Sequence, residues 1–295
     1  MDGILPLWKP KGMTSHDCVV KIRKLYRTKK VGHTGTLDPE VEGVLPICIG
    51  QATKIVPFLT DTKKTYIAEV KLGTATDTED GQGEVVESKP VNDFPTDDTV
   101  EDVLQSFQGD ITQVPPMYSA VKVNGRKLYE YARKNIEVER PKRTVTIFDI
   151  ERLPSDGQDI RFKVVCSKGT YIRTLCVDVG RKLGYPAHMA DLSRIQTGSF
   201  AEDDCIRFTE IEEAVEKNQE EQLLFPLSSG LNHLDVLQVD EATKKKVENG
   251  SKLMHPDEEL KTDPFRVMHG RLLLAIYQKH PEKPGQIKPV RVFHG

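Results

Sequence analysis

The stretch Gly32-His33-Thr34-Gly35-Thr36-Leu37-Asp38-Pro39 carries one carboxylate among small residues. Two glycines and a proline in eight residues exclude a regular helix or strand and predict a tight loop. The proline also restricts the backbone of Asp38, which would hold the carboxylate in place. A lone acid that follows a series of cations indicates chemistry on a polyanion. The cations are Lys21, Arg23, Lys24, Arg27, Lys29 and Lys30.

The same stretch also fits a glycine-rich turn that Asp38 only caps. It is not a phosphate-binding P-loop, because no Gly-Lys-Ser/Thr follows. The eight histidines form no HExxH or HxH pattern, and the five cysteines never form CxxC. The sequence therefore predicts no metal and no other cofactor, and the cysteines are expected to be reduced core thiols.

Three further residues would make the Asp38 loop catalytic. Arg173 stands where a strand passes through a glycine turn into a predicted helix, and its guanidinium there could hold a carboxylate ionised through two parallel bonds. Tyr66 follows two lysines and could stack on a base. Leu192 could pack against the same base. The simpler alternatives are a helix-surface arginine, a core tyrosine and a core leucine.

Length and composition describe a globular protein of one large and one small domain. The chain has 295 residues, of which 37% are hydrophobic and 29% charged. No apolar run reaches membrane-spanning length, and the start of the chain does not resemble a signal peptide, so a cytoplasmic protein without membrane contact is expected.

Charge is segregated along the chain although the net charge is only -3. Residues 117–143 carry eight basic and three acidic side chains, a balance of +5, and form a candidate RNA-binding face. A merely solvated surface is the alternative. The cations expected to contact RNA are Lys122, Arg126, Lys127 and Arg133.

The hydrophobic pattern predicts alternating helices and strands. Thr14 and Ser15 can cap a helix with Val19, Ile22 and Tyr26 on one side. Strands are expected at 65–72, 144–150 and 162–166, and helices at 100–107 and 172–183. Residues 115–142 interrupt this alternation and are predicted to be an insertion. A β-rich domain is expected at 234–295, with a hairpin at His269-Gly270.

Several motifs together resemble the TruB family of bacterial tRNA pseudouridine-55 synthases, in order from Leu5 to Asp235. The motifs are Lys9-Pro10-Lys11-Gly12-Met13-Thr14-Ser15, the loop from Gly32 to Pro39, Leu45-Pro46-Ile47-Cys48-Ile49-Gly50-Gln51-Ala52-Thr53-Lys54, Pro116-Met117-Tyr118-Ser119-Ala120, Lys127-Leu128-Tyr129-Glu130-Tyr131-Ala132, Ser167-Lys168-Gly169-Thr170-Tyr171-Ile172-Arg173-Thr174 and Gly184-Tyr185-Pro186-Ala187-His188.

The resemblance implies an α+β fold with a mixed sheet. Residues 1–233 would form the catalytic domain, with the RNA-gripping insertion at about 115–142, and residues 234–295 a PUA-like RNA-binding domain. The activity implied is isomerisation of uridine 55 in the T-loop of tRNA, without a cofactor. The enzyme would act as a monomer on the T-arm and would need no protein partner.

The resemblance also implies roles for individual residues. Asp38 would be the nucleophile, attacking C6 or C1′ of a flipped uridine, with Arg173 as its partner. Tyr66 would stack on the ring, and its pKa near ~10 makes it a poor base unless the site lowers that pKa. The remaining substrate-binding residues would be His33, beside the flipped nucleotide, Tyr171, Leu192 and Lys9.

Two other classes of function remain open from the sequence. One is an RNA-binding protein that helps tRNA to fold independently of catalysis. The other is a synthase for ribosomal or guide-paired RNA. A basic insertion within the chain itself favours independent recognition of tRNA.

Overall fold

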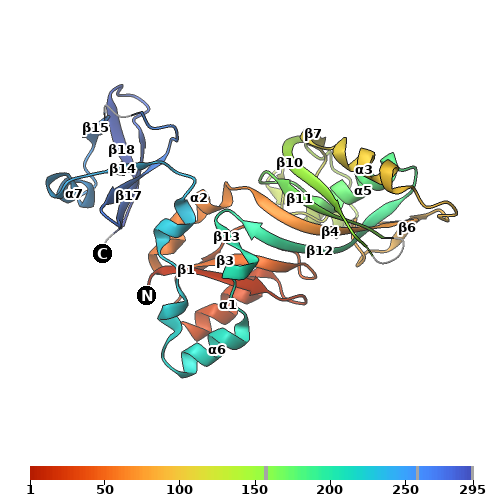
Figure 1. Cartoon of the computed structure of the whole chain (residues 1–295), viewed down its shortest axis with the longest axis horizontal. Helices are drawn as coiled ribbons and strands as arrows, with labels where there is room; N and C mark the ends of the chain where they lie inside the picture. The colour runs from red at the N-terminus through yellow and green to blue at the C-terminus, as the bar shows by residue number, and fades with distance from the viewer. Residues whose placement is uncertain (156–158, 257–258, 294–295) are drawn as a thin grey trace.

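The computed structural model describes residues 1–155, 159–256 and 259–293 and contains two main sheets (Figure 1). The larger, nine-stranded sheet forms the body, and the smaller, five-stranded sheet forms the C-terminal part. Seven strands of the large sheet follow one another in the order β1 (Gly3–Lys9), β3 (Glu42–Ile49), β12 (Ala187–Thr197), β4 (Lys64–Leu72), β11 (Asp159–Cys166), β10 (Arg143–Leu153) and β7 (Gly109–Gln113). The short strands β2 (Val31–His33) and β13 (Phe200–Ala201) pair with β3 and β12.

One parallel contact joins the two halves of the large sheet. All other neighbouring strands in it are antiparallel, but β12 runs parallel to β3 through the pairs Ser193–Glu42 and Arg194–Gly43. We call this contact the seam. The loop that carries Asp38 leads directly into β3, so the sheet places Asp38 beside the seam.

Each half of the large sheet has its own helices and apolar core. On one half, α3 (Asp97–Gln105) and α5 (Ile172–Lys182) contact β10, β4 and β12. On the other half, α1 (Ser15–Leu25) and α6 (Phe208–Glu216) share a buried cluster with β1 and β3. The start of α1 is confirmed, since Thr14 and Asp17 form a capping box. The α3 helix ends before Phe107, which had been predicted to lie within it.

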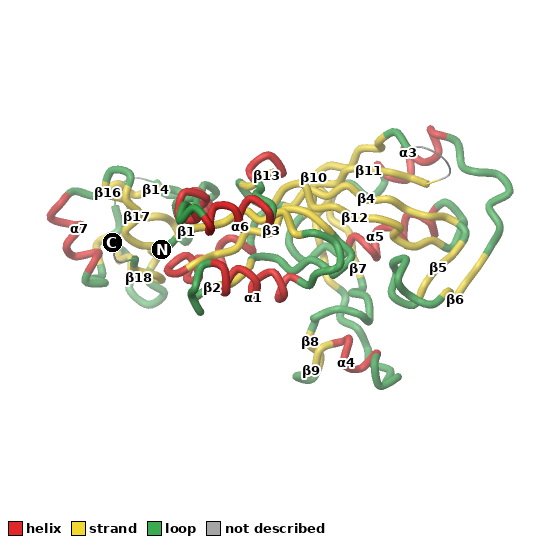
Figure 2. The backbone as a smooth tube through the Cα atoms, turned by 90° about the horizontal axis from the view of Figure 1, so that it is seen from below, coloured by secondary structure: helices red, strands yellow, loops and turns green. Residues whose placement is uncertain are grey.

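The insertion consists of short elements between β7 and β10: β8 (Lys122–Val123), β9 (Arg126–Lys127) and α4 (Leu128–Ala132). It projects from the body of the protein, as Figure 2 shows. A second ribbon, β5 (Thr74–Thr76) with β6 (Val85–Ser88), follows β4. The remaining short helices are α2 (Val56–Thr60), η1 (Gly50–Ile55), η2 (Glu202–Asp204), η3 (Glu220–Leu223) and η4 (Leu227–Leu231).

The C-terminal sheet has the order β14 (Val236–Gln238), β16 (Phe265–His269), β17 (Leu272–Lys279), β18 (Gln286–Val292) and β15 (Leu253–Met254), with α7 (Glu241–Glu248) beside it. The predicted hairpin is confirmed, because β16 and β17 are antiparallel and Gly270 between them has φ +58°. The mixed α+β class and the β-rich C-terminal region are likewise confirmed. The PUA-like assignment and the domain boundary stay predictions.

Candidate active site

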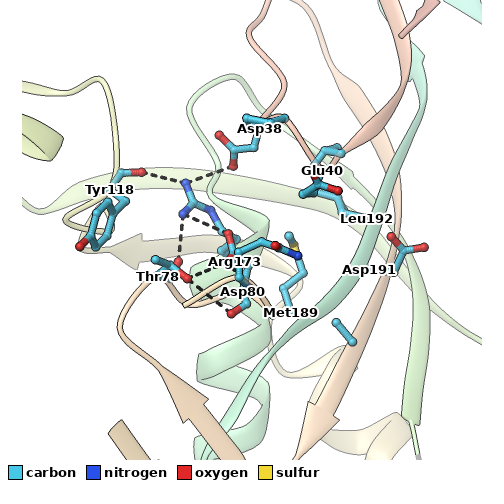
Figure 3. Close-up of a pocket in the computed structure, with 14 residues that line it drawn as sticks. Asp38, Glu40, Thr78, Asp80, Tyr118, Arg173, Met189, Asp191 and Leu192 are labelled. Carbon is cyan, nitrogen blue, oxygen red and sulfur yellow. Dashed lines mark hydrogen bonds and ion pairs between the residues drawn. The ribbon is translucent and has the colours of Figure 1, made fainter. Parts of the chain in front are cut away.

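The guanidinium group of Arg173 joins α5 to three other segments of the chain, which carry Asp38, Asp80 and Tyr118 (Figure 3). It lies in the first turn of α5, and its side chain is only 7% exposed. Nη2 lies 3.1 Å from Oδ2 of Asp38 and donates to the carbonyl of Tyr118 at 2.9 Å. Nη1 donates to the carbonyl of Thr78 at 2.9 Å and lies 3.6 Å from Oδ2 of Asp80.

The structure therefore brings Asp38 and Arg173 together, but not through the two parallel bonds expected. Only Nη2 contacts Asp38, because Nη1 is directed to Thr78 and Asp80. Asp80 is itself fixed, since its Oδ1 accepts from the Thr78 hydroxyl at 2.6 Å and from the backbone N–H of Gln82 at 3.0 Å. The guanidinium is thus held from two sides while the Asp38 carboxylate remains 46% exposed.

Backbone contacts hold the Asp38 loop on both sides of the aspartate. Ser15 exchanges hydrogen bonds with the backbone of Leu37, at 2.9 and 3.1 Å. Lys9 donates from Nζ to the carbonyl of Pro39 at 3.0 Å. Gly32 and His33 belong to β2, so the loop begins later than predicted, at Thr34.

Lys9 was expected to bind substrate, but the structure places its ammonium against backbone carbonyls. Its side chain is fully buried, and Nζ also donates to the carbonyls of Pro10 and Met13, at 2.9 and 2.6 Å. Burial lowers the pKa of Lys9. An ammonium already satisfied by three carbonyls cannot reach a phosphate, so Lys9 supports the Asp38 loop instead.

Asp38 lies between two adjoining cavities of about 390 and 440 Å³. Both volumes fall within the ~300–1,000 Å³ usual for small-molecule sites. We call them the Asp80 cavity and the Tyr66 cavity, after a residue that lines only one of them. Asp38, Tyr118, Arg173 and Leu192 line both, whereas Tyr171 and Arg194 line only the Tyr66 cavity.

Tyr66 lines one of the two cavities, whereas His33 lines neither. Tyr66 lines its cavity from β4, but burial raises the pKa of its hydroxyl, and the nearby Arg194 charge offsets this only in part. The shift makes Tyr66 a poorer base at neutral pH. His33, half-buried at the end of β2, is not among the residues that line either cavity. Burial, together with the Arg194 charge, lowers its pKa.

None of the four cations of the insertion is among the residues that line the Asp80 cavity or the Tyr66 cavity. Lys122, Arg126 and Arg133 are exposed, and Lys127 and Arg133 lie against the Tyr129 ring, at 5.3 Å each. Within the described ranges, none of the four is within 4.0 Å of a carboxylate. Their charge is therefore available to a polyanion.

Sequence reasoning missed Asp80, Thr78 and the role of Tyr118. No role was predicted for Asp80, although Asp80-Gly81 is a turn signal that could have marked it. Thr78 and Tyr118 contribute backbone carbonyls to the site. Because every residue has a backbone carbonyl, the residue type could not have identified these acceptors.

Two family models match the chain. Residues 23–172 match the N-terminal domain of the TruB family of pseudouridylate synthases, and residues 173–234 match the tRNA pseudouridylate synthase B C-terminal domain. In the part of the chain that the structure describes, no helix is long and apolar enough to cross a membrane.

Similar proteins span nearly the whole chain. A protein named tRNA pseudouridine synthase B from Oceanobacillus iheyensis is 60% identical over 99% of this chain and 98% of the relative. A protein of the same name from Bacillus subtilis is 54% identical over 99% of this chain and 98% of the relative. Among solved structures, a Cbf5-Nop10-Gar1 complex matches with a TM-score of 0.76 and 28% identity, over 99% of this chain and 84% of that one. An H/ACA RNP bound to a substrate RNA containing 2'-deoxyuridine matches with a TM-score of 0.77 and 25% sequence identity. That match covers 99% of this chain and 85% of the chain in the solved structure.

Proposed function

Because the chain belongs to the TruB family of pseudouridine synthases, we propose that it isomerises uridine 55 in the T-loop of tRNA, with Asp38 as the nucleophile. The observation that carries the proposal is the Arg173–Asp38 ion pair beside two cavities. The arginine is fixed by four groups, and the carboxylate it faces is accessible.

Asp38 needs a flipped nucleotide, since a base stacked within the folded T-arm cannot reach a carboxylate in a recess. Flipping costs a few kcal/mol, which contacts to the rest of the RNA must offset. In our proposal the uracil stacks on Tyr66 and packs against Leu192 and Tyr171, all of which line the Tyr66 cavity. His33 would act outside that cavity, on the strand that leads into the Asp38 loop.

The insertion would hold the T-arm through Lys122, Arg126, Lys127 and Arg133. Phosphate contacts of this kind give affinity without sequence preference, and the flipped base adds specificity. The chain is similar to relatives named tRNA pseudouridine synthase B over 98% of their length. This similarity supports tRNA, rather than guide-paired RNA, as the substrate. We further propose that the enzyme acts in the cytoplasm as a monomer, without a cofactor.

A role in tRNA folding is the second candidate. The four cations of the insertion lie outside the Asp38 loop, so the protein could hold the T-arm without catalysis. An Asp38→Asn variant would keep the role in tRNA folding and lose the isomerase activity.

The test uses a T-arm stem-loop with tritium at C5 of uridine 55. Wild-type protein should release tritium, because C5 loses its proton when it becomes the glycosidic carbon. Asp38→Asn should release none while binding the RNA within a few-fold of wild type, because the amide keeps the shape but not the nucleophile. Pseudouridine mapped to another position, or substantial turnover by Asp38→Asn, would contradict the proposal.

A further inference from the structure

Arg194 is a second buried arginine beside the cavities, and no role was expected for it. It lies on β12 at the seam and is 1% exposed. Its Nε donates to the carbonyl of Val44 at 2.9 Å, and Nη2 donates to the carbonyl of Gly35 at 2.8 Å. One side chain therefore connects the start of the Asp38 loop with the strand that follows the loop.

The loop is shaped to accept this arginine. A Cβ atom on Gly35 would lie 3.1 Å from Nη1 of Arg194, and one on Gly43 would lie 2.2 Å from the Arg194 carbonyl oxygen. Both glycines have positive φ, at +68° and +124°. The backbone of Arg194 thus occupies space beside Gly43 that only glycine leaves open, and its side chain packs tightly against Gly35.

The charge of Arg194 has no acidic partner. Within residues 1–155, 159–256 and 259–293, no carboxylate lies within 4.0 Å of it, whereas Arg173 has Asp38 and Asp80. A buried cation whose partners are two carbonyls and the Tyr66 hydroxyl is costly, and a neutral side chain of similar size would avoid the cost. Fixing the loop is therefore not a sufficient reason for a guanidinium.

The field of this cation reaches the Tyr66 cavity. Arg194 lines that cavity and is the direct cross-strand partner of Tyr66. It also acts on Lys64 in the same wall: burial, followed by the Arg194 charge, lowers the pKa of Lys64 to about 8.

The isomerisation moves negative charge in the direction of this cavity. If Asp38 attacks C1′, the N1–C1′ bond breaks and its electron pair stays on N1 of the uracil. If Asp38 attacks C6, the electron pair of the C5–C6 bond moves into the ring toward O4. In both cases the carboxylate gives up its charge and the ring gains it. On the C6 path the N1–C1′ bond then breaks as well. When the new C5–C1′ bond has formed, Asp38 has been expelled from C1′ or is eliminated from C6, C5 loses its proton and N1 gains one.

We propose that Arg194 is a positioning residue that holds the Asp38 loop and whose fixed charge also stabilises the uracil anion from behind Tyr66. The proposal rests on the proposed function, because it needs Asp38 to react with a uridine in the Tyr66 cavity. Preorganised charge of this kind is effective because the site need not reorganise as the anion forms.

The experiment compares Arg194→Met, Arg194→Lys and wild type on T-arm RNA with uridine or 5-fluorouridine at position 55. Fluorine withdraws electrons and stabilises the ring anion, so it should partly replace a missing cation. Single-turnover rates at saturating protein are followed by nuclease digestion and mass detection of the rearranged nucleoside, which keeps its fluorine when the substrate is 5-fluorouridine, because C5 then has no proton to release. Thermal melting shows that each variant folds, and Arg152→Met, a partly buried arginine paired with Asp97, is the control.

We expect Arg194→Met to lower the uridine rate by about 10²–10³, the usual effect of removing one preorganised group. Its penalty on 5-fluorouridine should be at least about tenfold smaller. Arg194→Lys keeps the charge but not both carbonyl contacts, so its two penalties should be equal. Equal penalties for Arg194→Met on both substrates, or uridine turnover within twofold of wild type, would overturn the proposal. An inactive wild type would instead contradict the proposed function.

Discussion

The nitrogen of Arg173 that contacts Asp38 is the same one that donates to the carbonyl of Tyr118. Tyr118 stands near the start of the insertion, only four residues before Lys122. Asp38 and the start of the insertion therefore share one donor group. A displacement of the insertion on RNA binding would act on the Asp38 carboxylate through a single side chain.

Arg173→Lys should be nearly as damaging as Arg173→Ala. A lysine retains the charge, but one ammonium on a flexible stem cannot contact Asp38, Tyr118, Thr78 and Asp80 in the observed arrangement. We expect single-turnover tritium release to fall by about 10²-fold or more. Arg181→Lys, an exposed position on the same helix, is the matched control and should be unchanged. A near-normal rate for Arg173→Lys would show that charge alone is sufficient.

Lys9→Met should reduce turnover and stability but leave affinity for tRNA unchanged. The substitution removes the donor shared by three carbonyls, one of them adjacent to Asp38, and should cost about 1–3 kcal/mol of unfolding free energy. Urea denaturation and filter binding measure the two effects. Lys24→Met, an exposed lysine on α1, controls for the loss of one charge. Weaker binding with a shallower salt dependence would instead make Lys9 a phosphate ligand.

Changing Lys122, Arg126, Lys127 and Arg133 to Glu should weaken tRNA binding and flatten its salt dependence. Each lost phosphate contact lowers the log–log slope by about 0.7–0.9. The rate at saturating tRNA should fall less, because Asp38 and Arg173 lie outside the insertion. Dissociation constants at several salt concentrations decide the matter. The control exchanges Lys and Arg at the same positions, and an unchanged slope in the Glu variant would refute the assignment.

Stability should rise with pH through Lys64. Its pKa is about 8 in the folded protein, against 10.5 for a fully solvated lysine, so between these values the unfolded chain binds more protons. Unfolding therefore becomes less favourable as pH rises from 8 to 10.5, by at most about 3 kcal/mol. Urea unfolding of wild type and Lys64→Met is measured at pH values from about 7 to about 10. The free energy of unfolding of wild type should rise with pH relative to that of the variant. A constant difference would mean that the pKa of Lys64 is not lowered.

Local signals in the sequence predicted much of the fold. The capping residue Thr14 and the spacing of Val19 and Ile22 identified α1, and the alternation after Thr65 identified β4. These signals suffice because caps and side-chain periodicity depend on neighbours in the chain.

The parts of the site that depend on distant contacts could not be predicted. The family resemblance implied that Lys9 binds substrate, and only the folded turn supplies the three carbonyls to which its ammonium donates. Arg194 lay within a segment noticed for Leu192, and nothing in its type showed that it would be buried against Gly35. The Asp38–Arg173 pairing was predicted from motifs, but its single-nitrogen geometry required the positions of Asp80 and Thr78.

The seam has a consequence for protein synthesis. The two pairs that join the halves connect residues 42–43 with 193–194, so the ribosome must add about 150 residues after the first partner before the second exists. The strands β1, β2 and β3 are synthesised before Arg173 and Arg194, the two arginines that contact Asp38 and its loop. A nascent chain therefore carries Asp38 for most of its elongation without either arginine.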